Sequence, residues 1–123
     1  MKKRLIAALF CLALALPAAA QSNLKSHLLV DAGKQFALGG GQPGSFTVAG
    51  RNSGPVPVEV AERPRSGAVV SRGTLAPGQR ARLRFAEGST ALVVNRSARQ
   101  AVLDLTVRGD TRALQMVYEP ASR

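Results

Sequence analysis

The chain has 123 residues and a formal net charge of +10, with 17 Lys or Arg, 7 Asp or Glu, one Cys, one His and no Trp. A single Cys excludes an internal disulfide, and a single His excludes a metal site built on two or more His ligands. The length is that of one small domain.

The first twenty residues have the layout of a secretory signal peptide. A basic start at residues 1–4 precedes an apolar run over 5–16, and Pro17-Ala18-Ala19-Ala20 then stands before polar Gln21. The small residues offer a cleavage site after Ala20, and the apolar run is shorter than the ~20 residues of a membrane-spanning helix. We therefore expect a signal-peptide helix over 1–20 and a mature protein in the periplasm or secreted, with no integral membrane segment.

Cleavage after Ala20 changes the chemistry of the chain. It removes three basic residues, no acidic residue and Cys11, which leaves 103 residues with a net charge of +7 and no thiol. The mature protein then offers no thiolate nucleophile, and its fold depends on an apolar core.

Beyond residue 40, apolar and polar residues alternate with a period of two. The alternating runs lie at 46–48, 56–60, 80–85, 101–108 and 113–118, and residues typical of turns separate them. This pattern predicts half-buried β-strands in an all-β protein, either a sandwich or a small barrel. We expect a single antiparallel β-sandwich of about seven strands. The expected core contains Phe46, Val48, Val58, Val60, Leu83, Phe85, Leu92, Val94, Leu103, Leu105, Leu114 and Met116.

Two turn-forming sequences carry more specific expectations. Pro55 and Pro57 fall opposite the valine face of the 56–60 run, and proline cannot donate to a β-ladder. That strand should therefore lie at a sheet edge or start at the prolines. Arg108-Gly109-Asp110 copies an integrin-binding tripeptide, but it stands where we expect a hairpin turn between two strands.

Residues 21–44 allow two interpretations. Leu24, His27 and Leu28 fit one helical turn, whereas 28–30 and 36–38 fit two short strands, which we favour. We assign 21–44 to N-terminal strands and a Gly-rich loop at 39–44, in the same domain as a sandwich body over 45–123.

The strands and turns between residues 46 and 85 follow a recognisable order. Phe46-Thr47-Val48 is followed by Asn52-Ser53-Gly54-Pro55, by Val56-Pro57-Val58-Glu59-Val60, and by Leu75-Ala76-Pro77-Gly78 before Leu83-Arg84-Phe85. This order resembles the immunoglobulin-like first domain of periplasmic pilus-assembly chaperones, the PapD-like β-sandwiches, and the resemblance implies an immunoglobulin-like fold. Those chaperones anchor a client in the cleft between two domains, so no anchoring residue is carried over to this one-domain chain.

Residue types that support catalysis are scarce in the mature chain. A hydrolytic site would have to combine His27 with Asp31 and a serine such as Ser26 or Ser45. Only the presence of these residue types suggests it, and the carboxylates show no paired motif. We expect no enzymatic activity, no cofactor and no metal site.

The sharpest chemical feature is a row of arginines. Arg80, Arg82 and Arg84 project from one face of an extended strand at steps of about 7 Å. Such a row suits a polyanion such as lipopolysaccharide, an acidic glycan or nucleic acid; the alternative is a solvated strand face. The few aromatic residues argue against a base-stacking platform.

These features favour a non-enzymatic binding or assembly module. We expect it to be exported to the bacterial cell envelope and to act through a β-sheet edge or face on an envelope or secreted protein. The alternative function is polyanion binding through Arg80, Arg82 and Arg84.

Overall fold

The computed structural model describes residues 22–111 and 113–121, so the predicted signal peptide at 1–20 lies outside the described residues. The described residues form nine strands and no helix. The strands are β1 (Ser22–Val30), β2 (Lys34–Gly39), β3 (Phe46–Asn52), β4 (Val58–Arg63), β5 (Val70–Leu75), β6 (Arg80–Phe85), β7 (Thr90–Val94), β8 (Ala101–Gly109) and β9 (Met116–Pro120). Within these residues, no helix is long and apolar enough to cross a membrane.

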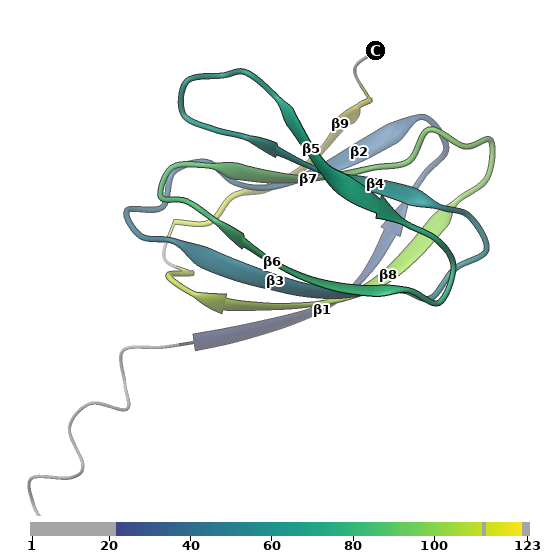
Figure 1. Cartoon of the computed structure of the whole chain (residues 1–123), viewed down its shortest axis with the longest axis horizontal. Helices are drawn as coiled ribbons and strands as arrows, with labels where there is room; N and C mark the ends of the chain where they lie inside the picture. Colours follow the sequence, from purple (N-terminus) through teal and green to yellow (C-terminus); the bar gives the residue numbers. More distant parts are fainter. Residues whose placement is uncertain (1–21, 112, 122–123) are drawn as a thin grey trace, which may run out of the picture.

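The strands form two antiparallel sheets that face each other in the manner of a β-sandwich (Figure 1). Sheet A has the order β1-β8-β3-β6, and sheet B has the order β5-β4-β7-β2-β9. Only the β4–β5 connection joins two strands of one sheet, while every other connection crosses between the sheets. The all-β prediction is confirmed, with nine strands in the described residues instead of about seven.

The preference for strands over a helix in residues 21–44 is also confirmed. β1 pairs with β8 along its whole length, with Leu28 opposite Leu103, and β2 pairs with β7, with Phe36 opposite Val93. These pairings bury the apolar residues that local sequence left ambiguous between the two structures.

The main core lies between the sheets. Phe46 of β3 and Phe85 of β6 lie directly opposite each other, and their rings stack with centroids 5.4 Å apart. Val30, Val58 and Leu103 are fully buried in the same core cluster. The inward residues of strands from both sheets therefore close one apolar layer.

Three residues of the expected core lie elsewhere. Leu92 and Val94 are buried, but they belong to a second cluster, with Ala37 and Ala61, on the opposite face of sheet B. Met116 is 51% exposed, because β9 is an edge strand that pairs only with β2. Burial of Met116 in the core was therefore a wrong prediction.

The two turn expectations have different outcomes. β4 pairs with both β5 and β7, so it is not an edge strand, but it begins at Val58, directly after Pro57. The prolines therefore mark the start of a strand. The hairpin at Gly109 was wrong, because β8 belongs to sheet A and β9 to sheet B, so the chain crosses between sheets there.

Three buried amide side chains hold the loops. Asn52 Nδ2 donates to the carbonyls of Val56 and Leu75, at 2.8 and 2.9 Å. Asn95 and Gln42 bind loop carbonyls in the same way, and all three side chains are fully buried. Since a buried polar group is stable only when bonded, these contacts fix the loops to the sandwich.

Candidate anion-binding face

Strand β6 presents its arginines on the outer face of sheet A. Phe85 is buried, and Ala81 and Leu83 pack against the core, so the intervening Arg80, Arg82 and Arg84 point away from it. The structure thus places the three arginines on one exposed face, as the alternation in the sequence indicates.

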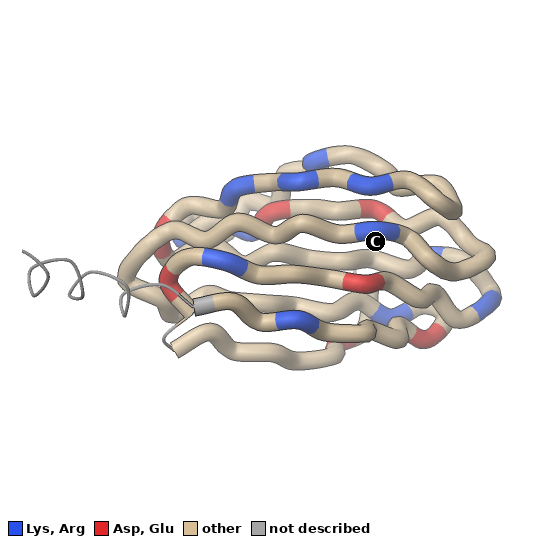
Figure 2. The backbone as a smooth tube through the Cα atoms, turned by 90° about the horizontal axis from the view of Figure 1, so that it is seen from below, with Lys and Arg blue, Asp and Glu red and all other residues tan. Residues whose placement is uncertain are grey.

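The strand register brings further basic residues to the same face. Arg51 of β3 lies opposite Arg80, Arg108 of β8 lies opposite Thr47 of β3, and Lys25 of β1 lies opposite Thr106 of β8. We call this surface the basic face; its basic residues are Lys25, Arg51, Arg80, Arg82, Arg84 and Arg108. Figure 2 views it from outside and shows blue segments along β6 and on the strands beside it.

Sequence reasoning missed Lys25, Arg51 and Arg108 as members of this site. Arg51 lies an odd number of positions along the strand from the inward Phe46 and Val48. Because side chains alternate between the two faces of a strand, this spacing was a local signal that Arg51 faces outward. Its position beside the arginine row, however, follows from the pairing of β3 with β6, which no local pattern reveals.

The centre of the basic face is hollow, because its floor consists of short side chains. Two adjoining shallow hollows of about 430 and 320 Å³ share Ala49, Arg82 and Thr106 as lining residues. Arg51 and Arg80 border the first hollow, and Thr47 and Arg108 border the second. A ligand lying on this floor would meet guanidinium groups at both ends.

Most of the basic side chains on this face lack an acidic partner. In the described residues the ion pairs are His27–Asp104, Arg63–Glu119, Arg72–Glu62 and Arg96–Glu59. Within that part of the chain, Arg80, Arg82 and Arg108 therefore have no ion pair, and Arg84 Nη2 donates to Ser45 Oγ at 3.0 Å. Like charges directly opposite each other, as at Arg51 and Arg80, destabilise a sheet.

Asp104 is the acidic residue of the basic face, and His27 engages it. Its Oδ1 lies 2.8 Å from His27 Nδ1. The hydrogen bond from His27 lowers the pKa of Asp104, as do a hydrogen bond from Ser53 and the charges of His27 and Arg51. Asp104 therefore stays ionised to lower pH than an ordinary carboxylate.

The residues named for a hydrolytic site are not brought together. Asp31 Oδ1 accepts a hydrogen bond from Gln100, while Ser45 binds Arg84 and His27 pairs with Asp104. Ser26 precedes His27 in an extended strand and so points to the opposite face of β1. The structure therefore does not assemble His27, Asp31 and a serine into one site.

In the part of the chain that the structure describes, no three His, Cys, Asp or Glu residues are placed to share a metal ion.

Comparisons with protein-family models, with curated proteins and with solved structures find no match for this chain.

Proposed function

We propose that this protein is an exported, non-enzymatic binding module of the bacterial cell envelope that holds an anionic partner on the basic face of sheet A. The observation that carries the proposal is the charge of that face. Six basic side chains lie on it, and four of them, Arg51, Arg80, Arg82 and Arg108, line its two adjoining hollows. The one carboxylate among the lining residues, Asp104, is engaged by His27.

The spacing of the arginines suits a ligand with several anionic groups. Outward side chains of one strand repeat at about 7 Å, and each guanidinium can bind a phosphate or carboxylate through two parallel hydrogen bonds. An anion between Arg51 and Arg80 would also relieve their mutual repulsion. Lipopolysaccharide, acidic glycans and nucleic acids are ligands of this class.

Two features of the sequence support the location and the fold type in this proposal. Residues 1–20 have the layout of a signal peptide with cleavage after Ala20, which directs a protein to the periplasm or beyond. The order of strands and turns over 46–85 resembles PapD-like sandwiches, so we assign the fold to the immunoglobulin-like type.

The test is the salt dependence of binding to heparin, used as a model polyanion. Changing Arg80, Arg82 and Arg84 to Gln should flatten the log–log slope by about three units, because each arginine would neutralise one anionic group of the polymer. The melting temperature should hardly move, because exposed substitutions usually change stability by less than ~0.5 kcal/mol.

The matched control removes the same charge away from the basic face. Lys34, Arg65 and Arg99 are exposed, and they lie in β2 and in loops; their triple change to Gln should leave most of the slope intact. Equal reductions of the slope in the two triple variants would show that heparin senses only net charge, and the proposal would fail.

A further inference from the structure

Strand β6 is a free edge of sheet A, since it pairs only with β3. The Arg72 guanidinium of β5 reaches across and donates from Nη1 to the carbonyl of Arg84 at 3.2 Å. That carbonyl therefore points away from β3. In an antiparallel strand the N–H and C=O of one residue point to the same side, and the backbone groups of every second residue point to that side as well. The N–H and C=O groups of Arg80 and Arg82 therefore also face the free edge.

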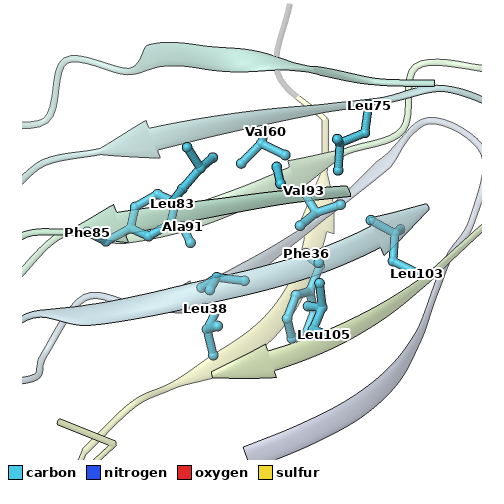
Figure 3. Close-up of a pocket in the computed structure, with 13 residues that line it drawn as sticks. Phe36, Leu38, Val60, Leu75, Leu83, Phe85, Ala91, Val93, Leu103 and Leu105 are labelled. Carbon is cyan, nitrogen blue, oxygen red and sulfur yellow. The ribbon is translucent and has the colours of Figure 1, made fainter. Parts of the chain in front are cut away.

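The space behind this edge is apolar. A cavity of about 30 Å³ lies between the sheets, and its lining includes Phe85 and Leu83 of β6 and Val60 of β4 (Figure 3). Leu83, Ala81 and Val60 point inward but are only partly buried. Core side chains of sheets A and B are therefore partly open to solvent beside β6.

Strand β6 lacks a bulge and a proline, two of the devices that protect a sheet edge, and its protection is the charge of its arginines. β5 has a register irregularity opposite Val60 and Ala61, and β9 ends at Pro120, whereas β6 has six residues with no bulge and no proline. Its arginines repel a second basic strand, so a pair of β6 edges from two copies of this chain is disfavoured.

We propose that the β6 edge accepts an extended segment of a partner protein in which acidic and apolar residues alternate. Its backbone would bond the outward N–H and C=O groups of β6. Its acidic side chains would lie beside Arg80, Arg82 and Arg84 on the basic face, and its apolar side chains would cover Leu83 and Val60. This inference rests on the proposed function, because Arg80, Arg82 and Arg84 would bind the anionic groups in both cases. It adds the chemical class of the partner, an extended acidic and apolar protein segment.

Arg72 is compatible with this addition. Its Nη1 also lies 2.6 Å from Glu62 Oε1, and its guanidinium lies 5.2 Å from the centre of the Phe85 ring. An added strand replaces only the bond from Arg72 to the Arg84 carbonyl. The ion pair with Glu62 keeps Arg72 in place at the end of the opening.

The test uses an eight-residue peptide of alternating Glu and Val on the full mature protein, with amide hydrogen exchange as the readout. Binding should slow exchange of the Arg80 and Arg82 amides, which point to the free edge. A peptide of the same composition with Glu and Val in blocks of two, and an alternating peptide N-methylated at every second residue, should bind more weakly. We expect affinity to fall by about fivefold for each hydrogen bond removed.

A pair of protein variants separates the edge from the charge. Arg82→Pro removes both the charge of Arg82 and its outward N–H. Arg82→Gln removes the same charge but keeps the N–H. The proline variant should bind the alternating peptide more weakly than the glutamine variant, while both bind heparin equally. If the proline variant does not fold, the N-methylated peptide still decides.

Two outcomes distinguish a failure of strand addition from a failure of the proposed function. Equal binding of the alternating, block and N-methylated peptides, or binding without slower exchange at Arg80 and Arg82, would overturn strand addition and leave the anion-binding face standing. Heparin binding that is insensitive to the change of all three arginines would overturn the proposed function itself.

Discussion

The buried amide of Asn52 gives a sharp test of how the sandwich is held together. Its Nδ2 donates to the carbonyls of Val56 and Leu75, and its Oδ1 accepts from the Gly54 N–H at 3.1 Å. The three bonds tie the end of β3 to the loop before β4 and to the end of β5. The residue is fully buried, so water cannot replace the amide without a rearrangement of these loops.

Asn52→Ala leaves two carbonyls and one N–H without this partner. A net hydrogen bond contributes about 0.5–1.5 kcal/mol, and a buried group left unsatisfied costs about 1–3 kcal/mol. We therefore expect the free energy of unfolding to fall by roughly 2–5 kcal/mol. For a domain of this size that lowers the melting temperature by about 10 °C or more.

The assay is urea unfolding followed by far-ultraviolet circular dichroism. Asn23→Ala is the matched control, because Asn23 is an exposed asparagine of β1, and it should change stability by less than ~0.5 kcal/mol. A decrease below about 1 kcal/mol for Asn52→Ala would contradict this role of the buried amide, since it would mean that solvent already satisfies these groups.

Three further predictions concern the core, an ion pair and the glycine at the end of β8. Leu105→Ala should cost about 2–5 kcal/mol in urea unfolding, because Leu105 is buried and already borders a cavity; a cost near zero would place Leu105 at the surface. A hydrogen bond from Gln35, and to a lesser extent one from Arg63, lowers the pKa of Glu119 from its ordinary value of 4.5. The ionised carboxylate of Glu119 therefore stabilises the folded protein fully above pH 4.5, and this stabilisation is lost as the pH falls through the lowered pKa. The difference in melting temperature between wild type and Glu119→Gln should therefore shrink below pH 4.5, and a difference that grows in acid would contradict the assigned bonds. Gly109→Ala should destabilise the protein by about 1–3 kcal/mol in the same unfolding assay, because φ is +113° and an added Cβ would lie 2.9 Å from the Ser45 carbonyl; an unchanged stability would exclude that backbone conformation.

Local sequence periodicity predicted the strands that alternate strictly. In β6 and β8 the inward residues recur at every second position, so the pattern is visible without knowledge of the partners. β5 was not anticipated, because Val70 and Leu75 enclose Ser71-Arg72-Gly73-Thr74 without alternation. Its register shifts where it passes Val60 and Ala61, which breaks the period of two.

The composition of the basic face depends on contacts that are distant in the chain. The common face of Arg80, Arg82 and Arg84 follows from the geometry of a single strand. Arg108 joins them only because β8 and β6 pair with opposite sides of β3, and Asp104 meets His27 across 77 residues. Sequence analysis could therefore identify the arginine row but not the hollow beside it.

The central claim is that an anionic partner lies on the basic face of sheet A, and the most direct measurement is mapping of backbone amide chemical shifts as a heparin oligosaccharide is added. We predict that the largest changes fall on Thr47, Ala49, Arg82 and Thr106, which line the two hollows. Changes spread evenly over both sheets, or centred on Leu92 and Val94 on the far face of sheet B, would contradict the account.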